Sequence, residues 1–291
     1  MFTFLTALDT NFIIPTSVML FSLDESLGTE YDCHIIVSKS DYAHVRQELD
    51  AIGLKKLKIK YLTIDLEKSS IANKNVSMRN IMHFSDAALF RLFSSSLIDA
   101  SYKRIAYLDG DLLVRKDLHE LTELKTSFAA VIDSDDHLVD SRVDKYFNSG
   151  VFIADLDFWR ECNAESRMLD FLYDNPDSVY KDQDALNFVF SNQNIKPLDA
   201  KFNYIPKNRT KFENASCDPH IVHFAGHLKP WLRSTPNSRF VEEWRLVSKL
   251  LSLDFAKEKK WHDIVFRGIY LIGLDKVFIQ IRNFLFSLIG K

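Results

Sequence analysis

Short apolar segments alternate with longer segments of helical periodicity along most of the chain. Apolar runs bounded by polar residues predict strands at Phe2–Leu8, Cys33–Ser38, Lys58–Ile64, Arg104–Leu108, Phe128–Ile132, Val151–Ala154 and His220–Phe224. Apolar positions three and four residues apart predict helices at Thr16–Leu27, Asp41–Ile52, Phe84–Ile98, Phe158–Tyr173, Asp182–Ser191 and Phe240–Leu251. This alternation predicts an α/β fold with a mostly parallel sheet covered by helices.

Polar residues follow several of these strands directly. Asp9 comes after the first strand, Asp109 after the fourth and Asp133 after the fifth, and His223 lies near the end of the last. Ligands of open α/β sheets bind at the carboxyl ends of the strands. We therefore expect these side chains, which are far apart in the chain, to meet at one edge of the sheet.

The stretch RIAYLDGDLLV carries two aspartates at the end of a predicted strand. Residues i and i+2 of an extended chain point the same way, so Asp109 and Asp111 can aim at one point, and Gly110 leaves room for a ligand. A divalent cation relieves the repulsion between two such carboxylates, and an added imidazole favours Mn²⁺ over Mg²⁺. The alternatives to a metal site are a solvated surface turn and a phosphatase motif of the form D-x-D-x-T. That motif needs Thr at the position of Leu113.

Composition narrows the classes of function. The net charge of −3 does not favour nucleic-acid binding. The three cysteines are widely separated and suggest neither a disulfide framework nor a zinc site, as expected for a reducing compartment. The chain has eight glycines and neither a GxGxxG nor a Walker motif, so a bound phosphate needs another device to neutralise it. The N-terminus does not resemble a signal peptide, and no apolar run approaches the roughly 20 residues of a membrane span.

Six stretches in order resemble glycosyltransferase family 8, and more closely its bacterial α-galactosyltransferases and glucosyltransferases that extend lipopolysaccharide. They are ALDTNF (7–12), HFSDAALFRL (83–92), YLDGDLLV (107–114), FNSGVFIADLDFWR (147–160), KDQDALN (181–187) and HFAGHLKPW (223–231). The resemblance implies a Rossmann-like nucleotide-diphosphosugar transferase fold of the GT-A type. It agrees with the alternation of strands and helices.

The resemblance also implies a role for each matching residue. The positions that contact uracil and ribose of a UDP-sugar are Asp9 and Asn11, with Phe12 stacking on the base. The Mn²⁺ ligands are Asp109, Asp111 and His223, and the diphosphate contacts are Gly226 and Lys229. The residues around the transferred sugar are Arg91, Asp133, Asn148, Asp182 and Gln183, and His83 lies on the acceptor side.

The family retains the anomeric configuration, which ordinarily requires a carboxylate nucleophile. Here the resemblance places the amide of Gln183 at the anomeric carbon, and a neutral amide is a poor nucleophile. We therefore expect attack by the acceptor on the face that the leaving group departs from, with Asp182 as a transient nucleophile the less favoured mechanism. Two structural alternatives remain open: Asp182 as a helix N-cap, and a three-histidine metal site of His220, His223 and His227.

Residues 257–291 differ from the rest of the chain. Seven basic and three acidic residues give this segment a charge of +4, and apolar residues recur at helical spacing from Leu274 to Leu288. We expect residues 1–256 to form the transferase domain and residues 257–291 a basic amphipathic tail on an anionic membrane surface. The alternatives are a helix packed on the domain itself and a dimer interface.

These observations predict a cytoplasmic enzyme at the inner face of the membrane. It would be Mn²⁺-dependent and transfer galactose, or as second choice glucose, from a UDP-sugar to a saccharide of lipopolysaccharide or a similar surface glycan. The alternatives are a non-catalytic UDP-sugar-binding protein of the same fold and a self-glycosylating primer.

Overall fold

A computed structural model describes residues 1–65, 87–133, 145–176, 178, 180–191, 195–206, 218–226, 229–232 and 235–253. The chain divides into two compact units. The first unit consists of the described residues between Met1 and Tyr204 together with Asp218–His223. The second unit consists of residues 205–206 and the described residues between 224 and 253. His83, His227 and the predicted tail lie outside the described residues. Within them, no helix has the length and hydrophobicity needed to cross a bilayer.

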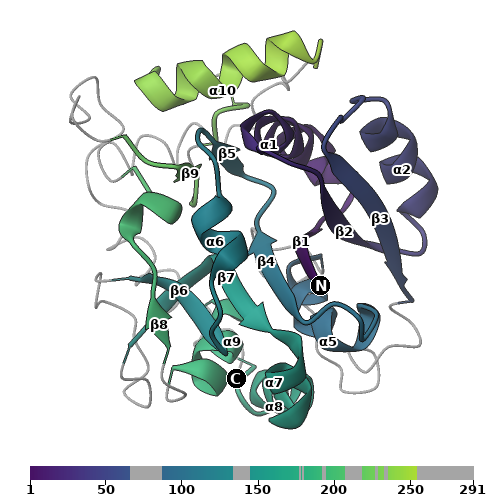
Figure 1. The fold of residues 1–291 in the computed structure, drawn as a ribbon, viewed down its shortest axis with the longest axis vertical. Helices are drawn as coiled ribbons and strands as arrows, with labels where there is room; N and C mark the ends of the chain where they lie inside the picture. Colours follow the sequence, from purple (N-terminus) through teal and green to yellow (C-terminus); the bar gives the residue numbers. More distant parts are fainter. Residues whose placement is uncertain are drawn as a thin grey trace, which may run out of the picture. The chain divides into compact units, whose positions relative to one another are not determined.

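A seven-stranded sheet with the order β3-β2-β1-β4-β7-β6-β8 forms the centre of the first unit (Figure 1). Its strands are β1 Phe2–Ala7, β2 Tyr31–Ser38, β3 Leu57–Ile64, β4 Arg104–Leu108, β6 Phe128–Ile132, β7 Phe147–Asp155 and β8 Lys196–Pro197. The pairs among β3, β2, β1 and β4 are parallel, which confirms the predicted α/β fold. β7 runs antiparallel to both of its neighbours. No helical pattern separates β6 from β7, and a parallel connection needs such a crossover.

Alternate strand residues supply two hydrophobic cores on opposite faces of this sheet. Phe4 and Ala106 belong to one core and Leu5 and Tyr107 to the other. The first core is covered by α1 Ile13–Ser26, α2 Tyr42–Asp50 and α6 His119–Glu123. The second is covered by α4 Ala87–Phe90, α5 Ser94–Leu97, α7 Leu156–Glu161, α8 Ala164–Asp174 and α9 Asp182–Phe190.

Several elements differ from their predictions. One helix was predicted over Phe84–Ile98, and the described part of this segment forms α4, a 3-10 turn at Arg91–Phe93 and α5. The helix predicted over Phe158–Tyr173 is divided into α7 and α8 at Asn163, whose φ is 50°. β5 Leu112–Val114 pairs with β9 Ile221–His223 in a second, antiparallel sheet. Three residues are too few to show a periodic pattern, so β5 was not predicted. In the second unit, α10 Arg239–Leu250 is N-capped by Ser238, near its predicted bounds.

The buried carboxylate of Asp24 joins α1 to the start of β3. It accepts hydrogen bonds of 2.7 to 3.1 Å from the backbone amides of Lys55, Lys56 and Leu57. We predict that Asp24→Ala lowers the free energy of unfolding by about 3 kcal/mol, because three backbone amides, including that of buried Leu57, lose their acceptor. Urea denaturation measures this, with the exposed neighbour Glu25→Ala, expected within about 0.5 kcal/mol of wild type, as the control. An Asp24→Ala loss below about 1 kcal/mol would contradict the assignment.

Candidate active site

Four segments from distant parts of the chain meet at one edge of the large sheet. β1, β4 and β6 run in the same direction, and Asp9, Asp109 and Asp133 follow them. β7 runs in the opposite direction, so its first residues, including Asn148, lie at this same edge. The backbone confirms this contact, since the Asp109 amide donates to the carbonyl oxygen of Gly150 at 2.9 Å. The predicted convergence at a strand edge is therefore present.

Asp109, Asp111 and His223 form a compact cluster at this edge. One ligand atom from each lies within 4.8 Å of the other two. Nε2 of His223 is 3.2 Å from Oδ1 of Asp111 and 3.9 Å from Oδ2 of Asp109. Asp111 and His223 are buried, and Asp109 is partly exposed. The three-histidine alternative is wrong for His220, whose Nδ1 donates to the carbonyl oxygen of Asp117 outside this cluster.

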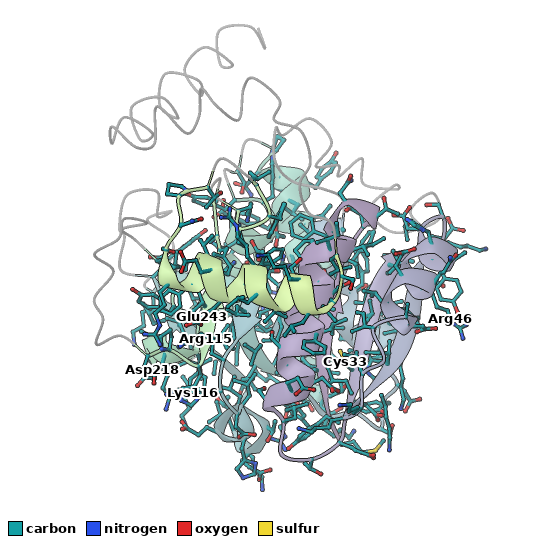
Figure 2. The ribbon with its side chains drawn as sticks, turned by 90° about the horizontal axis from the view of Figure 1, so that it is seen from above. Cys33, Arg46, Arg115, Lys116, Asp218 and Glu243 are labelled. Carbon is teal, nitrogen blue, oxygen red and sulfur yellow. The ribbon has the colours of Figure 1, made fainter. Side chains whose placement is uncertain are left out.

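The small β5–β9 sheet brings His223 to the aspartates. Leu112, the residue after Asp111, pairs with His223 in the register of these two strands. The start of this segment is held by ion pairs of Asp218 with Arg115, at 2.9 Å, and with Lys116. Figure 2 shows these three side chains gathered at one edge of the molecule. A three-residue pairing thus carries a distant histidine into reach of the D-G-D segment.

Two glycines leave the space that this arrangement needs. A Cβ atom at Gly150 would lie 2.3 Å from Cε1 of His223 and 2.9 Å from Oδ2 of Asp109. One at Gly110 would lie 2.4 Å from Oγ1 of Thr16 and 3.2 Å from Cδ1 of Phe12. The separations below 3.0 Å are too short for a real Cβ contact. The imidazole therefore packs directly on the backbone of β7, and the D-G-D segment packs directly on α1.

The cluster fits a divalent metal ion. It offers carboxylate oxygens from two residues and one imidazole nitrogen, a set suited to Mn²⁺. The ring of His223 is also supported on its far side, where Nδ1 lies 2.9 Å from Oδ1 of Asn203. Ligating histidines in metalloproteins typically have such a partner on the other ring nitrogen. Asp109, Asp111 and His223 could therefore hold the ion.

Arg91 connects this cluster to a further carboxylate. The buried guanidinium lies 2.9 Å from Oδ1 of Asp109 and 3.1 Å from Oδ2 of Asp182, and it stacks over the ring of Tyr107 at 4.5 Å. Burial raises the pKa of Asp182 to about 6, although Arg91 opposes the shift. Burial would lower the pKa of Arg91, but Asp109 and Asp182 raise it above its usual value. The guanidinium therefore stays charged and fixes two carboxylates at once.

The side chain of Gln183 lies at the start of α9 with its amide oriented by β7. Oε1 accepts from the backbone N–H of Ser149 at 3.1 Å and from Nδ2 of Asn148 at 3.2 Å. Nε2 donates to the hydroxyl of Tyr146 at 3.0 Å. Because a backbone N–H can only donate, these contacts define which end of the amide is the oxygen.

The alternative of Asp182 as an N-cap is wrong. Asp182 is the first residue of α9, the preceding Lys181 occupies the N-cap position, and Asp182 binds Arg91. Lys181 has a φ of 40°, a value that costs a side-chain-bearing residue about 1–3 kcal/mol. Strain of this kind is common at functional sites.

The residues predicted to bind the nucleotide and its diphosphate lie in both units. Asp9 accepts a hydrogen bond from the amide of Asn11 at 2.8 Å and caps a 3-10 turn, Thr10–Phe12. Asn11 is exposed, and Phe12 is half-buried beside Gly110. In the second unit, Gly226 has a φ of 82° and Nζ of Lys229 donates to the carbonyl oxygen of Phe224 at 2.8 Å. The nucleotide and diphosphate roles of these residues stay predictions.

Several residues at this site were not singled out by sequence reasoning. Asn203 and Tyr146 reach it through side-chain hydrogen bonds, and Tyr107 contacts Arg91 from inside an apolar strand. A single amide side chain in a loop forms no recognisable sequence pattern, so nothing in the sequence pointed to Asn203. Tyr107 had a weak sequence signal, because it lies two residues before Asp109. Its hydroxyl donates to the carboxylate of Asp109 at 2.9 Å.

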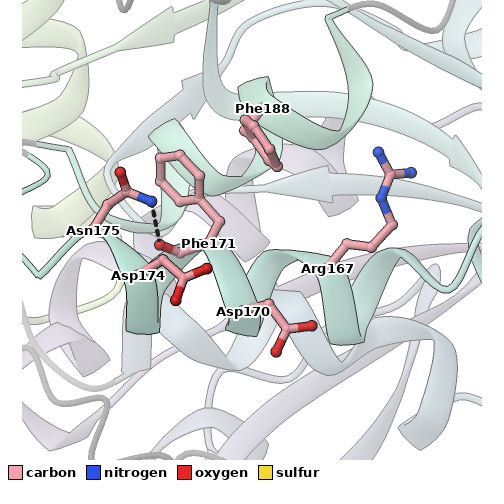
Figure 3. Close-up of a pocket in the computed structure, with 6 residues that line it drawn as sticks. All are labelled: Arg167, Asp170, Phe171, Asp174, Asn175 and Phe188. Carbon is pink, nitrogen blue, oxygen red and sulfur yellow. Dashed lines mark hydrogen bonds between the residues drawn. The ribbon is translucent and has the colours of Figure 1, made fainter.

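A separate hollow of about 430 Å³ lies between α8 and α9 (Figure 3). Its lining residues are Arg167, Asp170, Phe171, Asp174, Asn175 and Phe188. Nδ2 of Asn175 donates to the carbonyl oxygen of Phe171 at its wall. It contains none of the residues predicted for the active site, so we assign it no role.

The fold and the Asp-Asp-His cluster together define a GT-A-type glycosyltransferase architecture. The sequence profile of Glycosyl transferase family 8 matches residues 4–235, and the chain belongs to this family. The fold is similar to that in the crystal structure of the galactosyltransferase LgtC in complex with donor and acceptor sugar analogs. That match has a TM-score of 0.68 and 22 % identity, and covers 90 % of this chain and 99 % of LgtC. The family predicted from six sequence stretches is therefore confirmed.

Curated relatives include bacterial transferases. A lipopolysaccharide 1,2-glucosyltransferase of Escherichia coli is 26 % identical over 250 residues, which covers 77 % of this chain and 71 % of that protein. General stress protein A of Bacillus subtilis (strain 168) is 35 % identical over 176 residues, 53 % of this chain. The matched regions span 62 % of the stress protein and 53 % of glycosyltransferase GlyB of Streptococcus pneumoniae.

Proposed function

We propose that this chain transfers a hexose from a UDP-sugar to a saccharide acceptor and depends on Mn²⁺. The cluster of Asp109, Asp111 and His223 at the sheet edge is the observation that carries the proposal. When bound there, the cation would neutralise charge on the departing diphosphate. Asp9, Asn11 and Phe12 would bind the nucleoside on one flank, and Gly226 and Lys229 would bind the diphosphate.

The protein's own groups would then hold the donor sugar. Arg91 fixes Asp109 and Asp182 in place, which preorganises the charge around the anomeric carbon. Asn148, Asp133 and Gln183 would contact the sugar hydroxyls and the reacting carbon, and His83 the acceptor. The family resemblance placed Arg91 beside the transferred sugar. Its contacts with Asp109, Asp182 and the Ser149 carbonyl favour an indirect role.

We favour retention of configuration through attack by the acceptor on the face that UDP leaves. The carboxylate of Asp182 is 3.1 Å from Nε of Arg91, and a carboxylate neutralised in this way is a weaker nucleophile. The amide of Gln183 is anchored by Ser149 and can stabilise positive charge at the anomeric carbon with Oε1. Trapping a glycosyl adduct on Asp182 would support the two-step mechanism instead.

The acceptor we propose is a saccharide of lipopolysaccharide or a similar surface glycan, with galactose as first and glucose as second choice of donor sugar. Its support is the similarity to a lipopolysaccharide 1,2-glucosyltransferase and the fold shared with LgtC. A cytoplasmic location at the inner membrane face, reached through the basic tail, belongs to the same proposal. It depends on residues 257–291, outside the described part of the chain.

A screen of UDP-sugars with Mn²⁺ that measures release of UDP tests the proposal. We expect release from UDP-galactose or UDP-glucose, faster with an acceptor saccharide, and none in the presence of EDTA. Binding of a UDP-sugar without release under any condition would instead support the non-catalytic binding protein. Mass spectrometry that finds hexoses on the chain itself would support the primer.

A further inference from the structure

The ring of His223 is hydrogen-bonded on the side away from the carboxylates. Its Nδ1 lies 2.9 Å from Oδ1 of Asn203, and only 4 % of Asn203 is exposed. Nε2, on the opposite side, faces Oδ1 of Asp111 at 3.2 Å. A neutral imidazole has one proton for these two positions, and only the nitrogen without it can bind a metal ion.

A backbone amide decides where that proton lies. The N–H of Gly150 can only donate, so the Asn148 side-chain atom 2.9 Å away is its oxygen, Oδ1. This same oxygen is 2.9 Å from Asn203, which must therefore present Nδ2 to it. The other end of the Asn203 amide, Oδ1, then faces Nδ1 of His223, and an oxygen without protons requires a donor. The ring therefore donates to Asn203, and Asn203 donates to Asn148 of β7.

We propose that Asn203 is a positioning residue that keeps the proton of the neutral His223 ring on Nδ1, so that Nε2 presents its lone pair to the metal ion. The inference rests on the metal site of the proposed function. Without Asn203, the proton could move to Nε2 and be donated to Asp111, and metal binding would then have to displace it.

The same amide chain extends to the reacting centre. Nδ2 of Asn148 donates to Oε1 of Gln183 at 3.2 Å, and the amide of Ser149 donates to the same oxygen. Asn203 therefore stands between the metal ligand His223 and Gln183. Its loss should alter the metal site first, because it contacts His223 directly and Gln183 only through Asn148.

The ring tautomer of wild-type His223 is the first test and requires no metal. Nitrogen-15 NMR of the metal-free protein, at a pH where the ring is neutral, distinguishes a protonated Nδ1 from a protonated Nε2. We expect the proton on Nδ1. A neutral ring with its proton on Nε2 would overturn the proposal.

Mn²⁺ affinity of two Asn203 variants is the second test. Asn203→Leu keeps the approximate volume but removes the acceptor, and we expect Mn²⁺ to bind about 10- to 100-fold more weakly. Asn203→Asp keeps an oxygen facing Nδ1 but sets its second oxygen against Oδ1 of Asn148, so we expect an Mn²⁺ affinity lower than that of wild type and higher than that of Asn203→Leu. If folded Asn203→Leu, checked by circular dichroism, bound Mn²⁺ as tightly as wild type, the proposal would fail. Wild-type protein that bound no Mn²⁺ would contradict the proposed function, and the tautomer would still decide the role of Asn203.

Discussion

Asp111→Asn is expected to reduce donor turnover about 1,000-fold at Mn²⁺ concentrations that saturate the wild type. The change keeps the side chain's size and removes its charge from a buried position in the metal cluster. A factor of 1,000 corresponds to about 4 kcal/mol of transition-state stabilisation, within the several kcal/mol that a Lewis-acid cation supplies. Release of UDP from the preferred donor measures the effect.

Two features make this experiment specific. Asp111 lies close to Asp109, so removing one charge relieves repulsion, and we expect the thermal transition of the variant to stay at or above that of wild type. Asp117→Asn is the matched control, because Asp117 is exposed and lies outside the cluster. Turnover by Asp111→Asn within tenfold of wild type would show that this carboxylate does not serve the reaction.

Arg91→Lys is expected to lower both stability and turnover although the charge is kept. A lysine has no planar fork and cannot reach Asp109, Asp182 and the Ser149 carbonyl together. Breaking a buried ion pair typically costs 3–5 kcal/mol, so we expect a loss of about 3 kcal/mol in the free energy of unfolding. Turnover should fall about 100-fold, because Asp109 and Asp182 lose their common anchor.

Arg46→Lys provides the comparison for this substitution. Arg46 pairs with Asp50 at 3.2 Å on the surface of α2, and 55 % of its side chain is exposed (Figure 2). Exposed pairs contribute about 1 kcal/mol or less, so this variant should match wild type in urea denaturation and in activity. If Arg91→Lys behaved like Arg46→Lys, the buried bridge would have no role in holding the site.

Much of the fold follows from local patterns. The bounds of β4 and β6 were predicted to the residue, because each is a short apolar run between polar residues. The antiparallel direction of β7 was not predicted, because its apolar run gives a strand but not the direction of that strand. The helix predicted to begin at Phe84 breaks at Arg91, where the chain turns its guanidinium toward Asp109.

The candidate site was predictable only in part. The i and i+2 spacing around Gly110 was sufficient to pair Asp109 with Asp111. His223 was expected at this edge from its place near a strand end, but its role as a ligand came from the family resemblance. Its approach to the aspartates depends on the three-residue β5–β9 pairing. The amide of Asn203 was not predictable, because hydrogen bonds between distant loop residues leave no periodic signal.

The most direct test of the metal site is a titration of wild-type protein and Asp111→Asn with Mn²⁺, with UDP present, followed by electron paramagnetic resonance. We expect one tightly bound ion per wild-type chain and a loss of that binding in Asp111→Asn. Equal binding by both proteins, or no binding by the wild type, would contradict the metal site on which the proposed reaction depends.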